Sequence, residues 1–178
     1  MLMSAGPPAD SPLRHAADLL GMAVGDDSGS RLYWALIDPG LAESADCTYR
    51  GYEGAGAFYT SFSGEPKQAA ENLGVVLAEL RKVQREAITP EELEQARSKV
   101  LSRVVRGSER PKGRLFALGM DWTYQGRYLS VDDDLKAYEA VTRADVRAVL
   151  ERYPLDRVTT LALGPLKALS AAEGNGQA

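Results

Sequence analysis

The most informative residues of this chain are 28–42, SGSRLYWALIDPGLA, and 46–63, DCTYRGYEGAGAFYTSFS. The first part predicts a short helix over residues 30–37, because Pro39 and Gly40 break the helical pattern after it. In the second part, Tyr and Phe residues alternate with Thr, Ser and Gly around a glycine-rich centre at 54–56. This composition predicts two antiparallel strands joined by a turn or a bulge.

Amphipathic helices are predicted on both sides of this hairpin. Before it, Ser11 followed by Pro12 predicts a helix start, with Ser11 as the N-cap. After it, a helix that starts at Pro66 carries apolar residues at helical spacing, which are Ala69, Leu73, Val76, Leu77, Leu80 and Val83. The stretch 89–92, TPEE, predicts the start of the next helix, with a Thr cap and a Glu that closes a capping box.

Three further elements complete the pattern. A helix containing Leu115, Leu118 and Trp122 is predicted to end near Gly126, and another helix is predicted to open at residues 142–145, TRAD. Residues 157–163, rich in Val, Thr and Leu, predict a last strand. The fold class that follows is α+β, an antiparallel sheet with helices packed on one face. Residues 1–165 are predicted to form one domain and residues 166–178 a disordered tail.

Composition excludes several classes of function. The 178 residues carry a formal net charge of −4 with a sequence pI of about 5.1, and no basic stripe stands out, so we expect no nucleic-acid partner. No apolar run reaches ~18 residues, so we expect no membrane span. The start, residues 1–3, is too short and uncharged for a signal peptide, which favours the cytoplasm but does not fix the compartment.

The order and spacing of these motifs resemble the substrate-binding half of the pitrilysin/insulinase family of zinc peptidases, a domain like those of the mitochondrial processing peptidase. The resemblance covers roughly residues 1–165, although no single motif is strict. It implies a non-catalytic C-terminal half that forms one wall of a peptide-binding cleft in a zinc metalloendopeptidase. Zinc is then expected in a homologous half with an H-x-x-E-H helix, either in the same parent chain or in a separate subunit.

The resemblance also implies a position for two accessory catalytic residues. Active members supply an arginine and a tyrosine in the pattern Leu-Arg-x-x-x-Gly-Leu-Ala-Tyr, where they hold the substrate carbonyl and its oxyanion. Here residues 36–43 read LIDPGLAE, one residue shorter, with Ile37 at the arginine position and Glu43 at the tyrosine position. Neither an isoleucine nor an ionised glutamate can donate a hydrogen bond, so we expect no catalytic residue in this chain. The same loss favours an alternative, a structural or interaction subunit descended from such a peptidase, like core subunits of the respiratory bc complex.

Other candidate residues have both a functional and a structural interpretation. His15 is the only histidine and Cys47 the only cysteine, so we expect no metal site in this chain, a structural or surface role for His15, and burial for Cys47. The acidic run at residues 132–134 is expected to lie at a helix N-terminus rather than to bind a cation. Gly54 and Gly56 are expected to permit a bulge rather than to bind phosphate.

The tyrosines of the predicted hairpin are candidate substrate-binding residues. Tyr49, Tyr52 and Tyr59 could line a peptide cleft, or they could be cross-strand packing pairs, and the sequence does not decide between the two. Because the family's half usually begins with about one more strand, we also expect this chain to lack its first strand. A sheet edge left unpaired in this way would template association, so we expect a possible homo-oligomer of the isolated chain.

Overall fold

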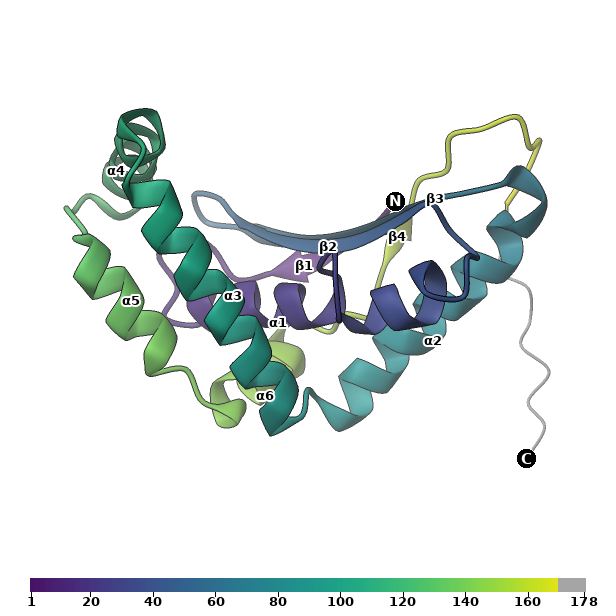
Figure 1. Ribbon diagram of the computed structural model, residues 1–178, viewed down its shortest axis with the longest axis horizontal. Helices are drawn as coiled ribbons and strands as arrows, with labels where there is room; N and C mark the ends of the chain where they lie inside the picture. Colours follow the sequence, from purple (N-terminus) through teal and green to yellow (C-terminus); the bar gives the residue numbers. More distant parts are fainter. Residues whose placement is uncertain (170–178) are drawn as a thin grey trace.

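The computed structural model describes residues 1–169, and its centre is a four-stranded antiparallel sheet with the order β2-β3-β1-β4 (Figure 1). The strands are β1 (Leu2–Gly6), β2 (Ser44–Gly51), β3 (Gly56–Ser63) and β4 (Thr159–Thr160). The hairpin β2–β3 pairs along its full length, with Cys47 opposite Thr60 and Tyr49 opposite Phe58. This confirms the hairpin that the aromatic and glycine pattern predicts.

Helices cover one face of this sheet and leave the other face open (Figure 1). They are α1 (Arg14–Val24), the π-helix η1 (Tyr33–Ile37), the 3-10 helix η2 (Pro66–Gln68), α2 (Ala69–Glu86), α3 (Pro90–Ser108), α4 (Pro111–Gln125), α5 (Val131–Glu139) and α6 (Arg143–Arg152). One helix differs from the rest, because α4 rises above the sheet at one end of the molecule. The predicted α+β class with helices on one face is confirmed.

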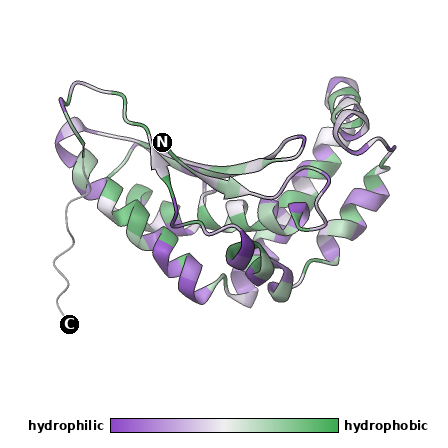
Figure 2. Ribbon diagram, turned by 180° about the vertical axis from the view of Figure 1, so that it is seen from behind, coloured by the Kyte–Doolittle hydropathy of each residue, from purple (hydrophilic) through white to green (hydrophobic). Residues whose placement is uncertain are grey.

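The hydrophobic core lies between the sheet and the helix layer. The strands alternate buried and exposed residues, so that Leu2, Phe58 and Cys47 point toward the helices. Apart from α4, the helices turn mainly hydrophobic residues toward the sheet and hydrophilic ones outward (Figure 2). Cys47 is buried as expected, and its burial raises the pKa of the thiol to about 12. It is therefore protonated and unreactive at neutral pH.

Three capping boxes define where helices begin. Thr89 with Glu92, Ser130 with Asp133 and Thr142 with Asp145 each exchange side-chain and backbone hydrogen bonds across the first turn. The boxes at α3 and α6 start where the sequence predicts, and the acidic run at residues 132–134 lies in the first turn of α5. Local sequence therefore fixes these three starts without help from tertiary contacts.

Helix α1 lies so close to the edge strand β2 that glycine is required between them. A side-chain carbon at Gly25 would lie 2.2 Å from the backbone nitrogen of Cys47. In its place, the Cys47 N–H donates to the Gly25 carbonyl at 2.9 Å. The end of α1 thus partners an outward-facing amide of β2, which leaves β4 as the less protected edge of the sheet.

The structure differs from the sequence-based expectations at two places. Helix α1 begins at Arg14, because Ser11 instead accepts a hydrogen bond from the Leu13 N–H in a preceding turn. The last strand is only Thr159–Thr160, since the residues after it leave the sheet. Residues 166–169 of the predicted tail line a cavity of about 330 Å³ beside α2, and Leu169 packs against the core; residues 170–178 lie outside the described residues.

The first strand of the structure bears on the expectation that this chain lacks the family's first strand. Residues 2–6 form β1 at an inner position of the sheet, and Gly6 leads through Pro7 and Pro8 into α1. The chain thus opens with a strand, a turn and a helix. A further strand before it stays a prediction.

Candidate functional site

The segment that carries the two family positions forms a tightly bonded turn ahead of β2. In η1 the Asp38 N–H donates to the Tyr33 carbonyl at 2.9 Å, which is the wide spacing of a π-helix. The Leu36 carbonyl then accepts from both Leu41 and Ala42, at 2.9 and 3.0 Å. Gly40 adopts a φ of 72°, a left-handed conformation that favours glycine. The turn is therefore defined by its own backbone, although it is one residue shorter than the family pattern.

Asn72 of α2 fastens this turn to the helix layer. Its side chain is fully buried, and its amide donates to the Leu41 carbonyl at 2.7 Å. The other side-chain atom, Oδ1, has no hydrogen-bond partner among the described residues. Since a buried amide that lacks one partner costs stability, we interpret Asn72 as a residue that positions residues 38–43. The sequence gives no signal for this role.

The two family positions carry no donor. Ile37 is half-buried and packs against the hydrophobic core. Glu43 is exposed, and its backbone N–H, not its side chain, is engaged, donating to the Ser63 carbonyl at 2.8 Å. The arrangement therefore offers no side chain that could stabilise an oxyanion at either position.

Arg31 is the cation nearest in sequence to this turn, and it is committed to structure. Its Nε and Nη2 donate to the two carboxylate oxygens of Glu92 at 2.7 and 2.8 Å, and Nη2 also donates to the Ala87 carbonyl at 2.9 Å. The hydrogen bond to Glu92 raises the pKa of Arg31 against the opposing effect of burial. This bidentate pair joins the helix of residues 31–37 to the α2–α3 turn.

Glu92 has a second function in the same contact. Burial opposes its ionisation, but the hydrogen bonds from Arg31 and from the Thr89 N–H outweigh burial, so the pKa of Glu92 is lowered. One carboxylate thus closes the α3 capping box and neutralises Arg31. Sequence reasoning predicted the capping box but not the ion pair, because the partners lie 61 positions apart.

The three candidate tyrosines do not share a face of the sheet. Tyr49 points into the core, where it lies beside Phe58 and its hydroxyl donates to the Pro7 carbonyl at 2.7 Å. Burial raises the pKa of Tyr49 well above its usual range. The structure therefore places Tyr49 on the buried side of the sheet, in packing contact with Phe58.

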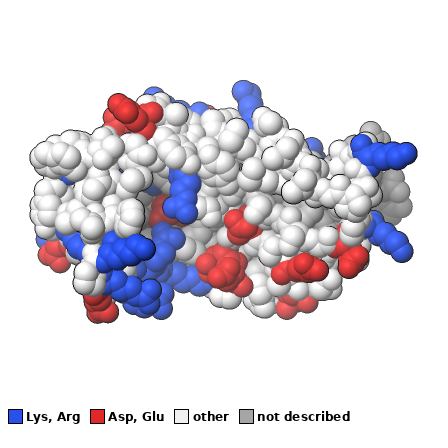
Figure 3. Space-filling view, turned by 90° about the horizontal axis from the view of Figure 1, so that it is seen from above, with Lys and Arg blue, Asp and Glu red and all other residues white. Residues whose placement is uncertain are grey.

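Tyr52 and Tyr59 lie on the accessible side. Their hydroxyl oxygens are 3.4 Å apart, close enough for a hydrogen bond in which either can donate. Tyr59 belongs to the open face of the sheet together with Met3, Ala5 and Thr48. Seen from above, the middle of this face is largely uncharged, and Lys and Arg gather at the end where α4 lies (Figure 3). The face is suited to contact an extended chain, but it carries no catalytic group.

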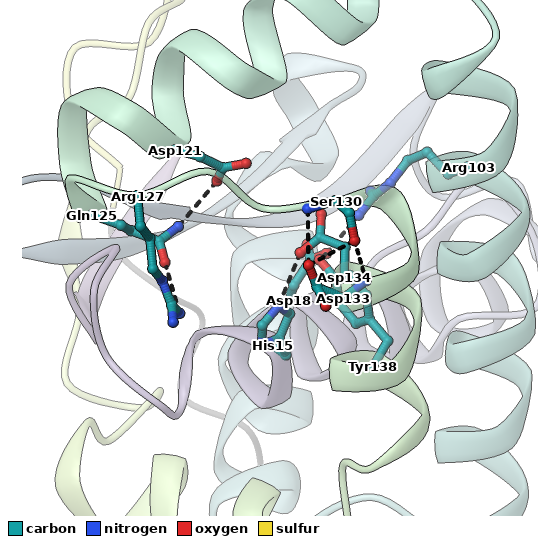
Figure 4. Close-up of polar contacts among 10 residues, drawn as sticks. All are labelled: His15, Asp18, Arg103, Asp121, Gln125, Arg127, Ser130, Asp133, Asp134 and Tyr138. Atoms are coloured by element: carbon teal, nitrogen blue, oxygen red, sulfur yellow. Dashed lines mark hydrogen bonds and ion pairs between the residues drawn. The ribbon is translucent and has the colours of Figure 1, made fainter.

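His15 is part of a polar cluster between α1, α3 and α5 (Figure 4). Its Nε2 lies 3.4 Å from Asp134 Oδ1, and its ring meets Tyr138 edge-on with centroids 4.7 Å apart. Tyr138 and Arg103 both donate to the carboxylate of Asp18, at 2.7 and 2.6 Å. His15 is therefore a buried packing residue, which is a structural role and not a surface one.

The next features are metal-ligand clusters and membrane-spanning helices in residues 1–169. Within residues 1–169 there is no group of three or more His, Cys, Asp or Glu side chains placed to bind a metal ion. The described residues thus do not fit the zinc site that the family resemblance implies for an active half. No helix in this part of the chain is long and apolar enough to cross a membrane.

Comparison with known proteins decides the family. The family model described as the peptidase M16 inactive domain matches residues 1–100. The chain belongs to the M16 peptidase family. An uncharacterized zinc protease of Streptomyces coelicolor is 30% identical over 155 residues, which are 86% of this chain and 34% of that protein. The chain therefore spans about one third of the length of this curated relative.

Solved structures show the same fold. The inactive peptidase domain of a proposed zinc protease from Bordetella parapertussis has a TM-score of 0.72 and 22% identity, and the match covers 93% of each chain. A chain of Complex III2 from Candida albicans has a TM-score of 0.69 at 12% identity, covering 85% of this chain and 39% of that one. The resemblance stated from the motifs is confirmed: this M16 domain is the inactive C-terminal half, which carries no catalytic centre.

Proposed function

We propose that this domain forms one wall of the peptide-binding cleft of an M16 zinc protease whose zinc-binding half is a homologous domain. The observation that carries the proposal is the open face of the sheet, which no described element covers. Its surface is largely uncharged apart from Asp46 and Arg50 of β2, and it presents Tyr59, with Tyr52 beside it. An extended peptide of little sequence specificity suits such a surface, because contacts with small side chains and hydroxyl groups do not require one particular partner.

The lost accessory pair limits what this wall can do. Ile37 and Glu43 cannot stabilise an oxyanion, so the contribution of this half is to binding rather than to the chemical step. Zinc, its ligands and the general base would all come from the other half.

A second candidate function is favoured by the same loss. A domain without the Arg/Tyr pair can also serve as a structural subunit, and the fold match to a chain of Complex III2 is consistent with that role. The two candidates differ in one observable, which is whether the partner half retains an intact H-x-x-E-H helix.

The test is peptide hydrolysis with unstructured peptides. The isolated chain should cleave nothing, with or without added zinc, whereas the full-length protein with its zinc-binding half should cleave in a zinc-dependent manner. In that full-length protein, Tyr59→Ala should raise KM about threefold to tenfold and leave kcat unchanged, since it removes binding that is equal in the ground and transition states. Trp34→Ala is the matched control, because Trp34 lies in η1 on the helix side of the sheet. An inactive full-length protein with a degenerate zinc motif would favour the structural subunit instead.

A further inference from the structure

Helix α4 has the reverse of the polarity that is usual for a helix at the surface of an isolated domain. None of the residues of Pro111–Gln125 is buried. The half-buried ones all lie on one side of the helix, and they are Arg114, Leu118, Asp121, Tyr124 and Gln125. The side that faces the rest of the domain is thus mainly polar.

The half-buried side of α4 makes polar contacts. Gln125 donates to Asp121 at 3.0 Å (Figure 4). Arg114 donates to the Leu129 carbonyl at 2.9 Å. Burial and the nearby Asp134 raise the pKa of Asp121, as expected for a carboxylate turned inward. The Arg114 bond joins α4 to the segment that follows it, whereas the Gln125–Asp121 bond lies within the helix.

The outer side of α4 is apolar and exposed. Leu115 is 69% exposed, Phe116 63%, Met120 48% and Trp122 65%. With about 100° between successive residues of a helix, these four and Gly119 fall within an arc of roughly 160°. We call these five residues the α4 face. Single exposed apolar residues are ordinary, but four large ones in a contiguous patch mark an interaction site.

The position and charge of the α4 face indicate what covers it. The helix rises on the same side of the sheet as the open face (Figure 1), so that one partner can cover both. Residues 103–127 hold six basic and two acidic side chains, in a chain whose net charge is −4. Figure 3 shows Lys and Arg gathered at this end. The complementary surface is therefore apolar with acidic side chains at its rim.

We propose that the α4 face is the docking surface for the homologous zinc-binding half, so that α4 closes one end of the cleft. This inference rests on the proposed function and adds the surface through which the two halves meet. The chain covers 34% of its Streptomyces coelicolor relative, so that protein carries further polypeptide that can supply the apolar partner. That same face explains why α4 turns its polar side inward: its apolar side is an interior surface of the assembled protein.

Two tryptophans provide a matched measurement. Trp122 lies in the α4 face and Trp34 in η1, and they are 65% and 61% exposed, which makes them nearly equal targets for hydroxyl-radical labelling. In the isolated chain both should be oxidised at similar rates, as read by mass spectrometry. When the zinc-binding half is present, joined or added separately, labelling of Trp122 should fall at least fivefold while labelling of Trp34 changes by less than twofold.

Variants give an independent reading. With the zinc-binding half added as a separate chain, Phe116→Ala and Trp122→Ala should each weaken binding at least tenfold, and Trp34→Ala should not. Because these side chains are exposed, the substitutions should leave folding intact, which the circular dichroism spectrum checks. Tight binding of the halves with Trp122 still labelled would overturn the docking surface and leave the proposed function standing. Failure of the halves to bind at all would overturn both.

Two other occupants are also outcomes of this experiment. Protection of Trp122 that rises with the concentration of this chain alone, and that the zinc-binding half does not increase, would assign the α4 face to a second copy. Binding to phosphatidylglycerol vesicles that Phe116→Ala abolishes would assign it to a lipid surface. Either result would overturn the proposal.

Discussion

Arg31 is the side chain on which the geometry of the candidate site most depends. It connects the helix before the family turn to Glu92 and to the Ala87 carbonyl. Ala87 itself has a φ of 59°, unusual for a residue other than glycine. One guanidinium thus holds together the site segment and the α2–α3 turn.

The first prediction concerns this ion pair and its dependence on pH. Glu92→Gln should reduce the free energy of unfolding at pH 7 by about 1–3 kcal/mol, because it leaves a largely buried Arg31 with a neutral partner. The pKa of Glu92 is lowered in the folded protein, so its contribution is present above the unfolded pKa of about 4.3 and is lost as the pH falls through the folded value. The difference between wild type and variant in urea unfolding should therefore shrink below about pH 4. A difference that stays constant down to pH 2 would contradict the assignment.

The second prediction concerns Glu43, the residue at the family tyrosine position. It is exposed, and a carboxylate opposes an oxyanion by charge, so Glu43→Gln in the full-length protein should change kcat/KM less than about threefold. A loss of ~100-fold, the size expected when one oxyanion donor is removed, would show that this acid takes part in the chemistry. The converse change, Ile37→Arg with Glu43→Tyr, raises activity only if the shortened turn places both side chains.

At the scale of the elements, close approach of backbones decides which positions tolerate a side chain. Gly25 lies against β2, where an added carbon would meet the Cys47 nitrogen at 2.2 Å, whereas at Gly119 in α4 an added carbon would meet nothing within 4 Å. The same substitution therefore has opposite consequences at these two helix-associated glycines.

The third prediction uses this pair. Gly25→Ala should destabilise the domain by about 1–3 kcal/mol or more, because α1 and β2 must separate to admit the methyl group. Gly119→Ala should stabilise it by about 0.5–1 kcal/mol, since it only removes the entropy cost of a helical glycine. Chemical denaturation of both variants measures this, and equal effects would contradict the close packing of α1 on β2.

Most of the elements could be predicted from sequence because their signals are local. The capping boxes at Thr89 and Thr142 and the stripe from Ala69 to Val83 each lie within one helix, and the hairpin joins neighbouring segments. The turn held by Asn72 and the Arg31–Glu92 pair could not be predicted, since each joins positions far apart in sequence. Tyr49 and Tyr59 could not be told apart, because the sequence pattern did not show which face of the hairpin is buried. The inverted polarity of α4 could not be predicted either, because its apolar residues suit a core and an interface equally well.

At the scale of the whole molecule, the two edges of the sheet differ. The β2 edge is covered where Gly25 meets Cys47. The β4 edge pairs with β1 over only two residues, and past it Leu161 and Leu163 are 62% and 104% exposed. An unprotected edge followed by exposed leucines is a template for pairing with another chain.

The fourth prediction is that the isolated chain associates through the β4 edge. Sedimentation velocity at several concentrations should show a dimer or larger species whose fraction rises with concentration. Leu163→Lys should shift this equilibrium toward monomer at least tenfold, because a charge at an exposed edge opposes strand pairing, and the exposed side chain can be changed without loss of core contacts. Met120→Lys, which places the same charge on the α4 face, should leave the equilibrium within about twofold of wild type. If Met120→Lys alone produces monomer, the α4 face and not the β4 edge mediates self-association. A wild-type chain that is monomeric at every concentration would contradict the prediction, because the β4 edge would then not template pairing.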